Sequence, residues 1–293
     1  MKVSVLVPFR AEAGEAGRIR TENWQWLEKR WQALLPQAEI VTGTDEGQPF
    51  SKTTAVNDAY SRASGDVFVI ADADSWVPIR HVVQSIDYVL RRQVLVVPWT
   101  IAHRLTAADT TRLRKMDPAT DQPFSQSMRK NVTDYRPSPS TAAMVVVVSR
   151  EGFERVGGMD PRFRGWGAED VAFGLACGAL LGLTKIILGE SYALYHKRPR
   201  KDGRRVWEND PGHHNIELGE RYWQAKGDPE KMTVICSEHP LSGAVFPVGP
   251  GPGAIYRPPE TYVPQLAQPA QPANWQRTER PYGGTRVGEI IQI

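Results

Sequence analysis

The chain has few cysteines, no long apolar run and little net charge. Its 293 residues include two cysteines, Cys177 and Cys236, too few for a disulfide framework or a cysteine-based metal site, so a reducing compartment is expected. No apolar run is long enough for a membrane span, and the amino terminus predicts a first strand instead of a signal peptide. The net charge of +3 does not require a nucleic acid or a membrane as partner. These absences predict a cytoplasmic protein without a membrane span.

Short apolar strands alternate with amphipathic helices over the first hundred residues. The β-branched and apolar spans 3–7, 39–42, 67–71 and 94–97 predict strands. Helices are predicted between them, one capped by Ser51 and one opened by Pro78. This alternation is typical of βαβ units and predicts an α/β fold with a mostly parallel sheet flanked by helices.

The pattern is less regular after Trp99. Strands are predicted over 142–148, 186–188 and 192–195, and the first of these, rich in β-branched residues, fits a central strand. Helices are predicted over 106–116, from Ser149 to Gly157, from 169 to about 181, and over 215–226. The segment 117–139 is expected to be irregular, and 215–226 is expected to be the last helix.

Two carboxylates stand one residue apart directly after the predicted strand 67–71, in Asp72-Ala73-Asp74. They fall at the carboxyl end of that strand, where open α/β sheets bind ligands. Alternation along an extended chain puts both side chains on the same side. A divalent cation that carries a diphosphate is the natural partner for such a pair, whereas the alternative is a pair of solvated turn aspartates.

A second motif, Gly165-Trp166-Gly167-Ala168-Glu169-Asp170, leads into a predicted helix. Glycines on both sides of a tryptophan favour a loop that brings backbone close to a ligand and offers a broad ring, and rings stack on sugar faces. The two carboxylates could instead only stabilise the amino terminus of the helix through its dipole. His196 follows a predicted strand, and the basic run 197–205 after it could be a solvated loop, a lid over a diphosphate, or a site for an anionic acceptor.

These motifs in this order resemble the GT-A fold nucleotide-sugar glycosyltransferases. The similarity is greatest to the inverting branch that includes chondroitin polymerases and galactosyltransferases with a Trp-Gly-x-Glu-Asp motif. It covers roughly residues 1–226. The resemblance implies one domain over 1–240, with a nucleotide-binding half at 1–100 and an acceptor or catalytic half at 101–240. Residues 241–293 carry nine of the 23 prolines and are expected to form an extended tail.

The resemblance also implies where the donor nucleotide and the metal bind. The predicted nucleotide-binding residues are Pro8, Phe9, Arg10, Asp45, Lys52, Asn57, Asp72 and Ala73. Among these, Asp45 would accept a hydrogen bond from uracil and Asp72 would bind the ribose. Asp74 and His196 would hold a divalent metal, and a nitrogen ligand among oxygens favours Mn²⁺ over Mg²⁺.

Catalysis is assigned by the same resemblance to the second motif. Asp170 would be the catalytic base, and Glu169 would bind hydroxyls of the sugar or the acceptor. Gly165, Trp166 and Gly167 would complete the substrate site. The expected activity is therefore transfer of a sugar, with inversion, from a UDP-sugar to an acceptor hydroxyl.

Two other functions fit parts of the pattern. A nucleotidyltransferase also combines a parallel sheet with paired aspartates, but it would need a glycine-rich basic loop after the first strand, which residues 8–14 do not supply. A non-catalytic carbohydrate- or nucleic-acid-binding protein would not need the acidic residues and histidine that this chain carries. The acceptor remains open among a glycan, a protein and a modified nucleic acid.

Overall fold

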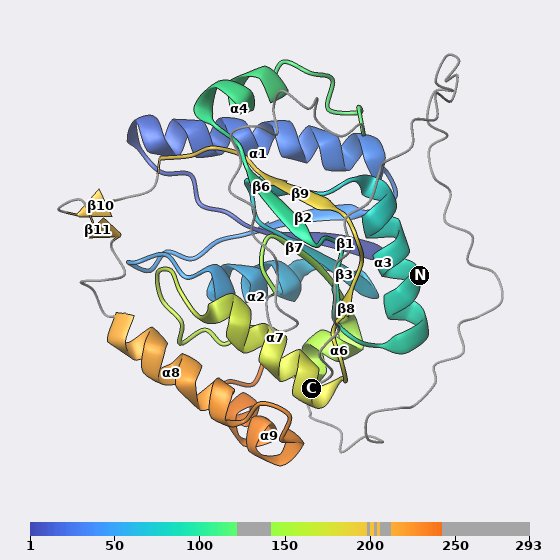
Figure 1. Cartoon of the computed structure of the whole chain (residues 1–293), viewed down its shortest axis with the longest axis vertical. Coiled ribbons are helices and arrows are strands. Elements are labelled where there is room, and N and C mark those ends of the chain that lie inside the picture. The colour runs from blue at the N-terminus through green and yellow to red at the C-terminus, as the bar shows by residue number, and fades with distance from the viewer. Residues whose placement is uncertain (122–141, 198–199, 202–203, 206–211, 242–293) are drawn as a thin grey trace, which may run out of the picture.

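The computed structural model describes residues 1–121, 142–197, 200–201, 204–205 and 212–241. Its centre is a six-stranded sheet with the strand order β2-β1-β3-β7-β5-β8 (Figure 1). The strands are β1 (Val3–Pro8), β2 (Glu39–Gly43), β3 (Val67–Ala71), β5 (Val96–Val97), β7 (Val145–Ser149) and β8 (Lys185–Ile186). The predicted α/β class, with a central sheet between helices, is confirmed.

All but one of these strands run in the same direction. Strand β1 pairs in parallel with β2 and β3, and β5 pairs in parallel with β8. Strand β7 lies between β3 and β5 and is antiparallel to both. Every residue of β7 is buried, as a central strand covered on both faces requires. The sheet is therefore mostly parallel, with one reversed strand at its middle.

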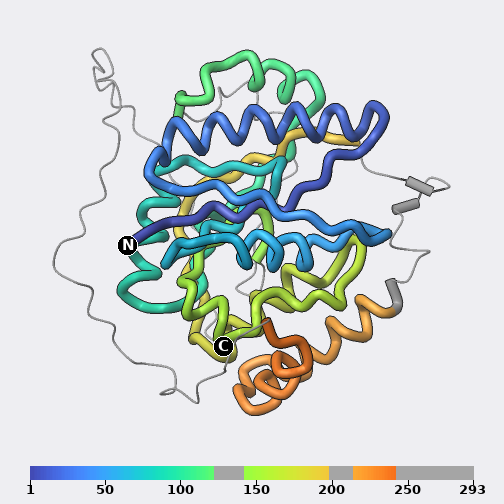
Figure 2. The backbone as a smooth tube through the Cα atoms, turned by 180° about the vertical axis from the view of Figure 1, so that it is seen from behind, coloured from blue at the N-terminus to red at the C-terminus, as the bar shows by residue number. Residues whose placement is uncertain are grey.

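Helices cover both faces of the sheet (Figures 1 and 2). The helices of the described residues are α1 (Gly14–Leu34), α2 (Lys52–Arg62), α3 (Ile79–Arg92), α4 (Ala107–Leu113), α6 (Arg150–Arg155), α7 (Glu169–Leu180), α8 (Gly212–Gln224) and α9 (Pro229–Ser237). Helix α1 lies over one face, and α2 and α7 lie over the other. Helix α7 contacts both α8 and α9, and its nearly continuous apolar surface suits burial on several sides.

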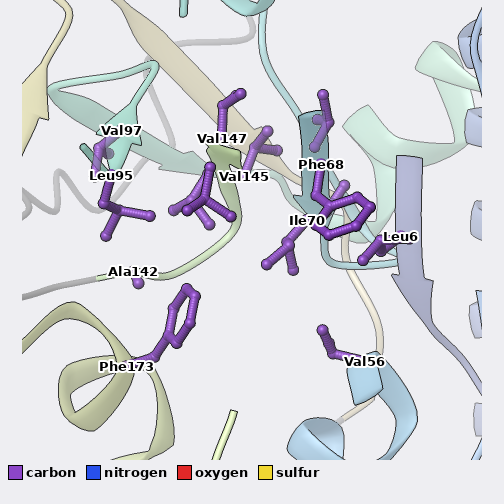
Figure 3. Packing of buried hydrophobic residues seen from close by; sticks show 14 of the residues in the cluster. Leu6, Val56, Phe68, Ile70, Leu95, Val97, Ala142, Val145, Val147 and Phe173 are labelled. Atoms are coloured by element: carbon purple, nitrogen blue, oxygen red, sulfur yellow. The ribbon is translucent and has the colours of Figure 1, made fainter. Parts of the chain in front are cut away.

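The core lies between the sheet and the helices that cover it. Figure 3 shows Val56 of α2 and Phe173 of α7 pointing towards Leu6 and Ile70 of the sheet. All four side chains are at most 4% exposed. Burying an apolar side chain of this size contributes roughly 1.5–3 kcal/mol relative to leaving it exposed. This packing fixes the starts of α2 and α7 against the same sheet.

Ser51 caps helix α2, as predicted. Its Oγ accepts a hydrogen bond from the Thr54 N–H at 3.2 Å and donates one to the Phe163 carbonyl at 2.8 Å. The cap therefore joins the start of α2 to the segment that precedes α7. Because Lys52 is the first residue of α2 and directly follows Ser51, this cap also fixes the position of the Lys52 backbone.

A second, three-stranded sheet was not predicted. It contains β4 (Ser75–Trp76), β9 (Glu190–Ala193) and β6 (Ile101–Arg104) in the order β4-β9-β6. Strand β4 pairs antiparallel with β9, and β9 pairs in parallel with β6. Two-residue and four-residue strands carry too little periodicity to be recognised without their partners. The small sheet joins the chain after Asp74 to the chain before His196.

The prediction that 215–226 is the last helix was wrong, because α9 (Pro229–Ser237) follows it. Asp228 caps α9 by accepting a bond from the Lys231 N–H at 3.0 Å, and the proline after it occupies the first helical position. Both signals are present in the sequence. The predicted tail lies outside the described residues from 242 onward. No described helix combines the length and the apolarity that crossing a membrane requires.

Candidate active site

The parallel strands β1, β2 and β3 have their carboxyl ends on the same side of the central sheet. The residues predicted to bind the sugar donor follow these strand ends. The Phe9 N–H donates to the Gly43 carbonyl at 2.9 Å, which holds the end of β1 beside the end of β2. Arg10 Nη1 donates to the carbonyls of Asp45 and Gly47, both at 2.8 Å. A cavity of ≈ 490 Å³ opens here, lined by Arg10, Ala11, Glu12, Ala13, Glu46 and Gln48. Arg10 thus lines a polar cavity, and Pro8 and Phe9 directly precede it in the chain.

Asp45 is buried and fully engaged by protein groups. Its Oδ2 accepts from the Ser51 N–H at 3.0 Å, and both carboxylate oxygens lie 3.0 Å from Arg164 Nη1. Burial opposes ionisation, but these bonds outweigh it and lower the pKa of Asp45. The structure shows Asp45 holding its loop; the contact with uracil stays a prediction. Arg164, half-exposed next to the glycine-tryptophan loop, was not recognised from the sequence.

Asn57 fixes the segment before α7. Its Nδ2 donates to the Met159 carbonyl at 2.7 Å, and its Oδ1 accepts from the Met159 N–H at 3.0 Å. These bonds supply the partners that a polar residue on the apolar face of a helix needs. They give Asn57 a positioning role that the sequence did not predict, and its contact with the nucleotide stays a prediction.

Lys52 joins two of the predicted functional carboxylates. Its Nζ lies 2.7 Å from Asp72 Oδ1 and 2.7 Å from Asp170 Oδ1. Asp72 follows β3, whereas Asp170 lies in the first turn of α7. The Asp72 N–H donates to the Met144 carbonyl at 2.7 Å, which fixes its backbone at the start of β7. The structure therefore brings the two predicted motifs together around one ammonium group.

Burial and mutual repulsion control the charges in this cluster. Burial raises the pKa of Asp170 to about 7, helped by the charges of Glu169 and Asp72 and opposed by Lys52. Burial also raises the pKa of Glu169. Burial alone would lower the pKa of Lys52, but the neighbouring carboxylates raise it above its ordinary value. Three carboxylates share one ammonium here, so its attraction does not cancel their repulsion and desolvation.

The loop before α7 is built around left-handed backbone. Gly165 and Gly167 have φ angles of 70° and 124°, in the region that glycine adopts at least cost. The Gly165 N–H donates to the Phe50 carbonyl at 3.0 Å, and the Gly167 N–H donates to Glu169 Oε2 at 2.8 Å. Trp166 between them is 56% exposed. The loop is thus tied to the start of α2 while it presents an aromatic ring at the surface.

Asp74 and His196, the predicted metal ligands, are in contact. His196 Nε2 lies 3.0 Å from Asp74 Oδ2, and Ser75 Oγ donates to Asp74 Oδ1 at 3.0 Å. Burial would raise the pKa of Asp74, but the hydrogen bond and charge of His196 bring it down to about 2. The pair offers a carboxylate oxygen and an imidazole nitrogen side by side, donor types that a divalent ion such as Mn²⁺ accepts.

The protein supplies few metal ligands at this point. Among the residues that the structure describes, no group of three or more His, Cys, Asp or Glu side chains is arranged to hold a metal. An ion held by Asp74 and His196 would therefore need oxygens from a ligand, and a diphosphate provides them.

Two buried side chains fix the backbone next to His196. Asn23 Nδ2 donates to the Tyr195 carbonyl at 3.0 Å, and Thr110 Oγ1 accepts from the Tyr195 N–H at 2.8 Å. The Leu194 N–H donates to the Asp74 carbonyl at 2.7 Å. Asn23 is fully buried and Thr110 is 2% exposed. These contacts could not be predicted from the sequence, since they join α1 and α4 to a strand end far along the chain.

Comparison with known families supports the resemblance seen in the motifs. Residues 124–177 match the model described as the N-terminal domain of galactosyltransferase. The chain resembles the galactosyltransferases. The matched range includes the loop 165–168, Glu169 and Asp170, and its first part lies outside the described residues. No curated protein sequence matches the chain.

Several solved structures of glycosyltransferases are similar to this chain. The catalytic domain of Drosophila β1,4-galactosyltransferase 7 in complex with xylobiose is 17% identical, with 75% of this chain and 80% of that chain covered and a TM-score of 0.45. GalNAc-T7 with UDP, GalNAc and Mn²⁺ is 14% identical, with coverage of 81% and 55% and a TM-score of 0.46. S. aureus TarS 1–349 is 12% identical, with coverage of 82% and 70% and a TM-score of 0.45. These scores are low.

Proposed function

We propose that this protein is a metal-dependent glycosyltransferase that moves a sugar from a UDP-sugar to an acceptor hydroxyl with inversion. The observation that carries the proposal is the meeting of two motifs at one sheet edge, where Lys52 Nζ lies 2.7 Å from both Asp72 and Asp170. The galactosyltransferase match, which spans Asp170, supports the same reaction class.

The donor nucleotide would bind along the edge formed by the ends of β1, β2 and β3. The cavity beside Arg10 is polar and open, which suits a nucleotide better than an apolar ligand. Asp72 would hold the ribose, and Asp74 with His196 would hold a divalent metal on the diphosphate. When bound, that metal would neutralise the charge that develops on the leaving nucleoside diphosphate.

Asp170 would act as the general base. Its ionised carboxylate would accept the proton of the acceptor hydroxyl while the hydroxyl oxygen forms a bond to the anomeric carbon and the bond to the diphosphate oxygen breaks. A pKa of about 7 suits a base that works near neutral pH. Attack from the side opposite the leaving group inverts the anomeric configuration. Trp166 would stack on a sugar ring, and Glu169 would bind its hydroxyls.

A screen of nucleotide sugars tests the proposed reaction. Full-length protein is incubated with Mn²⁺, one nucleotide sugar and a panel of sugar acceptors, and the released nucleotide is identified by chromatography. Release of a nucleoside diphosphate that stops with excess chelator and in Asp170→Asn is expected. In a parallel incubation with a sugar 1-phosphate and a nucleoside triphosphate, release of pyrophosphate would instead show a nucleotidyltransferase. Binding of a nucleotide sugar without turnover under all conditions would show a binding protein.

The hydrogen bond from Asn23 to the Tyr195 carbonyl leads to a prediction about metal affinity. Asn23→Ala removes the donor to the Tyr195 carbonyl, so the backbone that carries His196 loses one of its fixed contacts. Residues that orient metal ligands typically account for about 10–100-fold in metal affinity. We therefore expect Mn²⁺ affinity, measured by calorimetry with UDP present, to fall by about tenfold.

Ser85→Ala is the matched control for this prediction. Ser85 is also a fully buried polar residue, and its Oγ donates to the His81 carbonyl within α3, away from the site. Its loss should lower the thermal midpoint without changing metal affinity. Equal Mn²⁺ affinity in Asn23→Ala and the wild type would contradict the positioning role of Asn23.

A further inference from the structure

Among the described residues, only Lys52 contacts both a proposed ligand of the sugar donor, Asp72, and the proposed catalytic base, Asp170. It is the first residue of α2, and its side chain is 15% exposed. The residues it joins, Asp72 and Asp170, have side chains that are 27% and 21% exposed. A lysine this enclosed cannot move its charge into bulk water without leaving both partners. The ammonium is therefore a fixed part of the site.

The charge balance around Asp170 depends on this ammonium. The charged groups that act on Asp170 are Lys52 from α2, Asp72 after β3, and Glu169 from its own helix. Lys52 is the only cation among them. An opposite charge within hydrogen-bonding distance favours the ionised form of a carboxylate, whereas like charges disfavour it. Removal of Lys52 would leave Asp170 facing two carboxylates without compensation.

We infer, on the basis of the proposed function, that Lys52 is a positioning residue that keeps the Asp170 carboxylate ionised and aimed, and that Asp72 competes for the same ammonium. Lys52 would therefore act on the reaction through the base. The resemblance implied a direct contact of Lys52 with the nucleotide, with a solvated side chain as the alternative. Both roles use the same positive charge, but they predict different changes in the variants.

The pH dependence of kcat/KM separates the two roles. The base must be ionised, so kcat/KM in the wild type should rise with pH and level off above a midpoint near 7, the pKa of Asp170. In Lys52→Met the ionised form loses its cation, so the midpoint should move to higher pH by about one unit or more. Well below both midpoints, this shift is about a tenfold loss of activity per unit.

Two further variants distinguish a change of charge beside Asp170 from a general loss of structure. Lys52→Arg keeps the charge and should retain a midpoint close to that of the wild type. Asp72→Asn removes a repelling carboxylate and frees the ammonium for Asp170, so its midpoint should move to lower pH. Opposite shifts from two neighbouring substitutions are not expected from general loss of structure. Asp72→Asn also keeps the inference testable if Lys52→Met does not fold.

A readout that needs no activity distinguishes this inference from the proposed function. The Asp170 carboxyl carbon is followed by ¹³C NMR during a pH titration of the free protein, with Asp170→Asn used to assign its signal. A higher midpoint in Lys52→Met supports the inference even if no nucleotide sugar is turned over. An unchanged Asp170 midpoint, together with weaker UDP binding by calorimetry, would overturn it and make Lys52 a nucleotide contact.

Discussion

Asp170→Asn is expected to lower turnover by about 10²–10⁴-fold while leaving donor binding nearly unchanged. A general base typically contributes a factor in this range, and the amide of asparagine cannot accept a proton at neutral pH. The shape of the side chain is retained, and Lys52 keeps its contact with Asp72. Turnover is measured with a saturating nucleotide sugar and acceptor, and donor affinity is measured by calorimetry.

Glu169→Gln is the matched control for this experiment. Glu169 is the neighbour of Asp170 in the same helical turn, is buried, and accepts a hydrogen bond from the Gly167 N–H. As the proposed ligand of sugar or acceptor hydroxyls, it should raise KM before it lowers kcat. A fully active Asp170→Asn variant would show that the base has been wrongly assigned.

The stereochemistry of the product tests the same residue independently. A base that activates the acceptor behind the anomeric carbon implies a single displacement, and the new linkage then has the opposite configuration to the donor. Proton NMR of the first-formed product gives that configuration directly. Retention would exclude the single displacement even if Asp170→Asn were inactive.

Asp74→Ala is expected to abolish metal-dependent transfer, with a loss of about 100-fold or more in kcat/KM. Metal ions stabilise developing charge by several kcal/mol, and each 1.36 kcal/mol corresponds to about tenfold. Asp74 provides the only carboxylate in contact with His196 among the described residues, so its removal leaves one protein ligand. Activity is measured across a Mn²⁺ titration, and Mn²⁺ binding is measured by calorimetry with UDP.

Asp87→Ala controls for the loss of an aspartate. Asp87 is an exposed residue of α3 that pairs with Arg91 on the surface, and exposed pairs contribute about 0–1 kcal/mol to stability. It should match the wild type in activity, metal binding and circular dichroism. Activity of Asp74→Ala that equals the wild type in excess chelator would refute the metal site.

The sequence predicted the elements of this fold better than their pairing. Apart from β4, the strands and helices up to Val97 follow periodicity and caps, and Ser51 caps α2 as its position indicated. The reversed direction of β7 has no local signal, because a run of valines is equally suited to parallel and antiparallel pairing. Strands β4 and β6 depend on β9 for their existence, and propensity alone does not reveal them.

The sequence indicated the residues of the candidate site, but not which of them contact one another. The resemblance assigned Asp74 and His196 to one metal, and the structure places these two side chains in contact. It assigned Asp72 to the ribose and Asp170 to the acceptor hydroxyl without linking them, whereas the structure joins them through Lys52. Lys52, which contacts Asp170, precedes it by 118 positions in the chain, a separation at which sequence spacing carries no geometric information. Asn57 was expected to need a partner, but that this partner is the Met159 backbone could not be foreseen.

Because β4 pairs with β9, the distance between Asp74 and His196 depends on how many residues separate each of them from its strand. Ser75 pairs with Ala193, and each strand reaches its functional residue within a few positions. One extra residue between Ala193 and His196 would advance the histidine by about 3.3 Å and turn its side chain to the other face. Substitutions nearby can be absorbed by local repacking, whereas an insertion cannot. Among relatives that share the proposed metal ligands, this short stretch should therefore vary in composition but never in length.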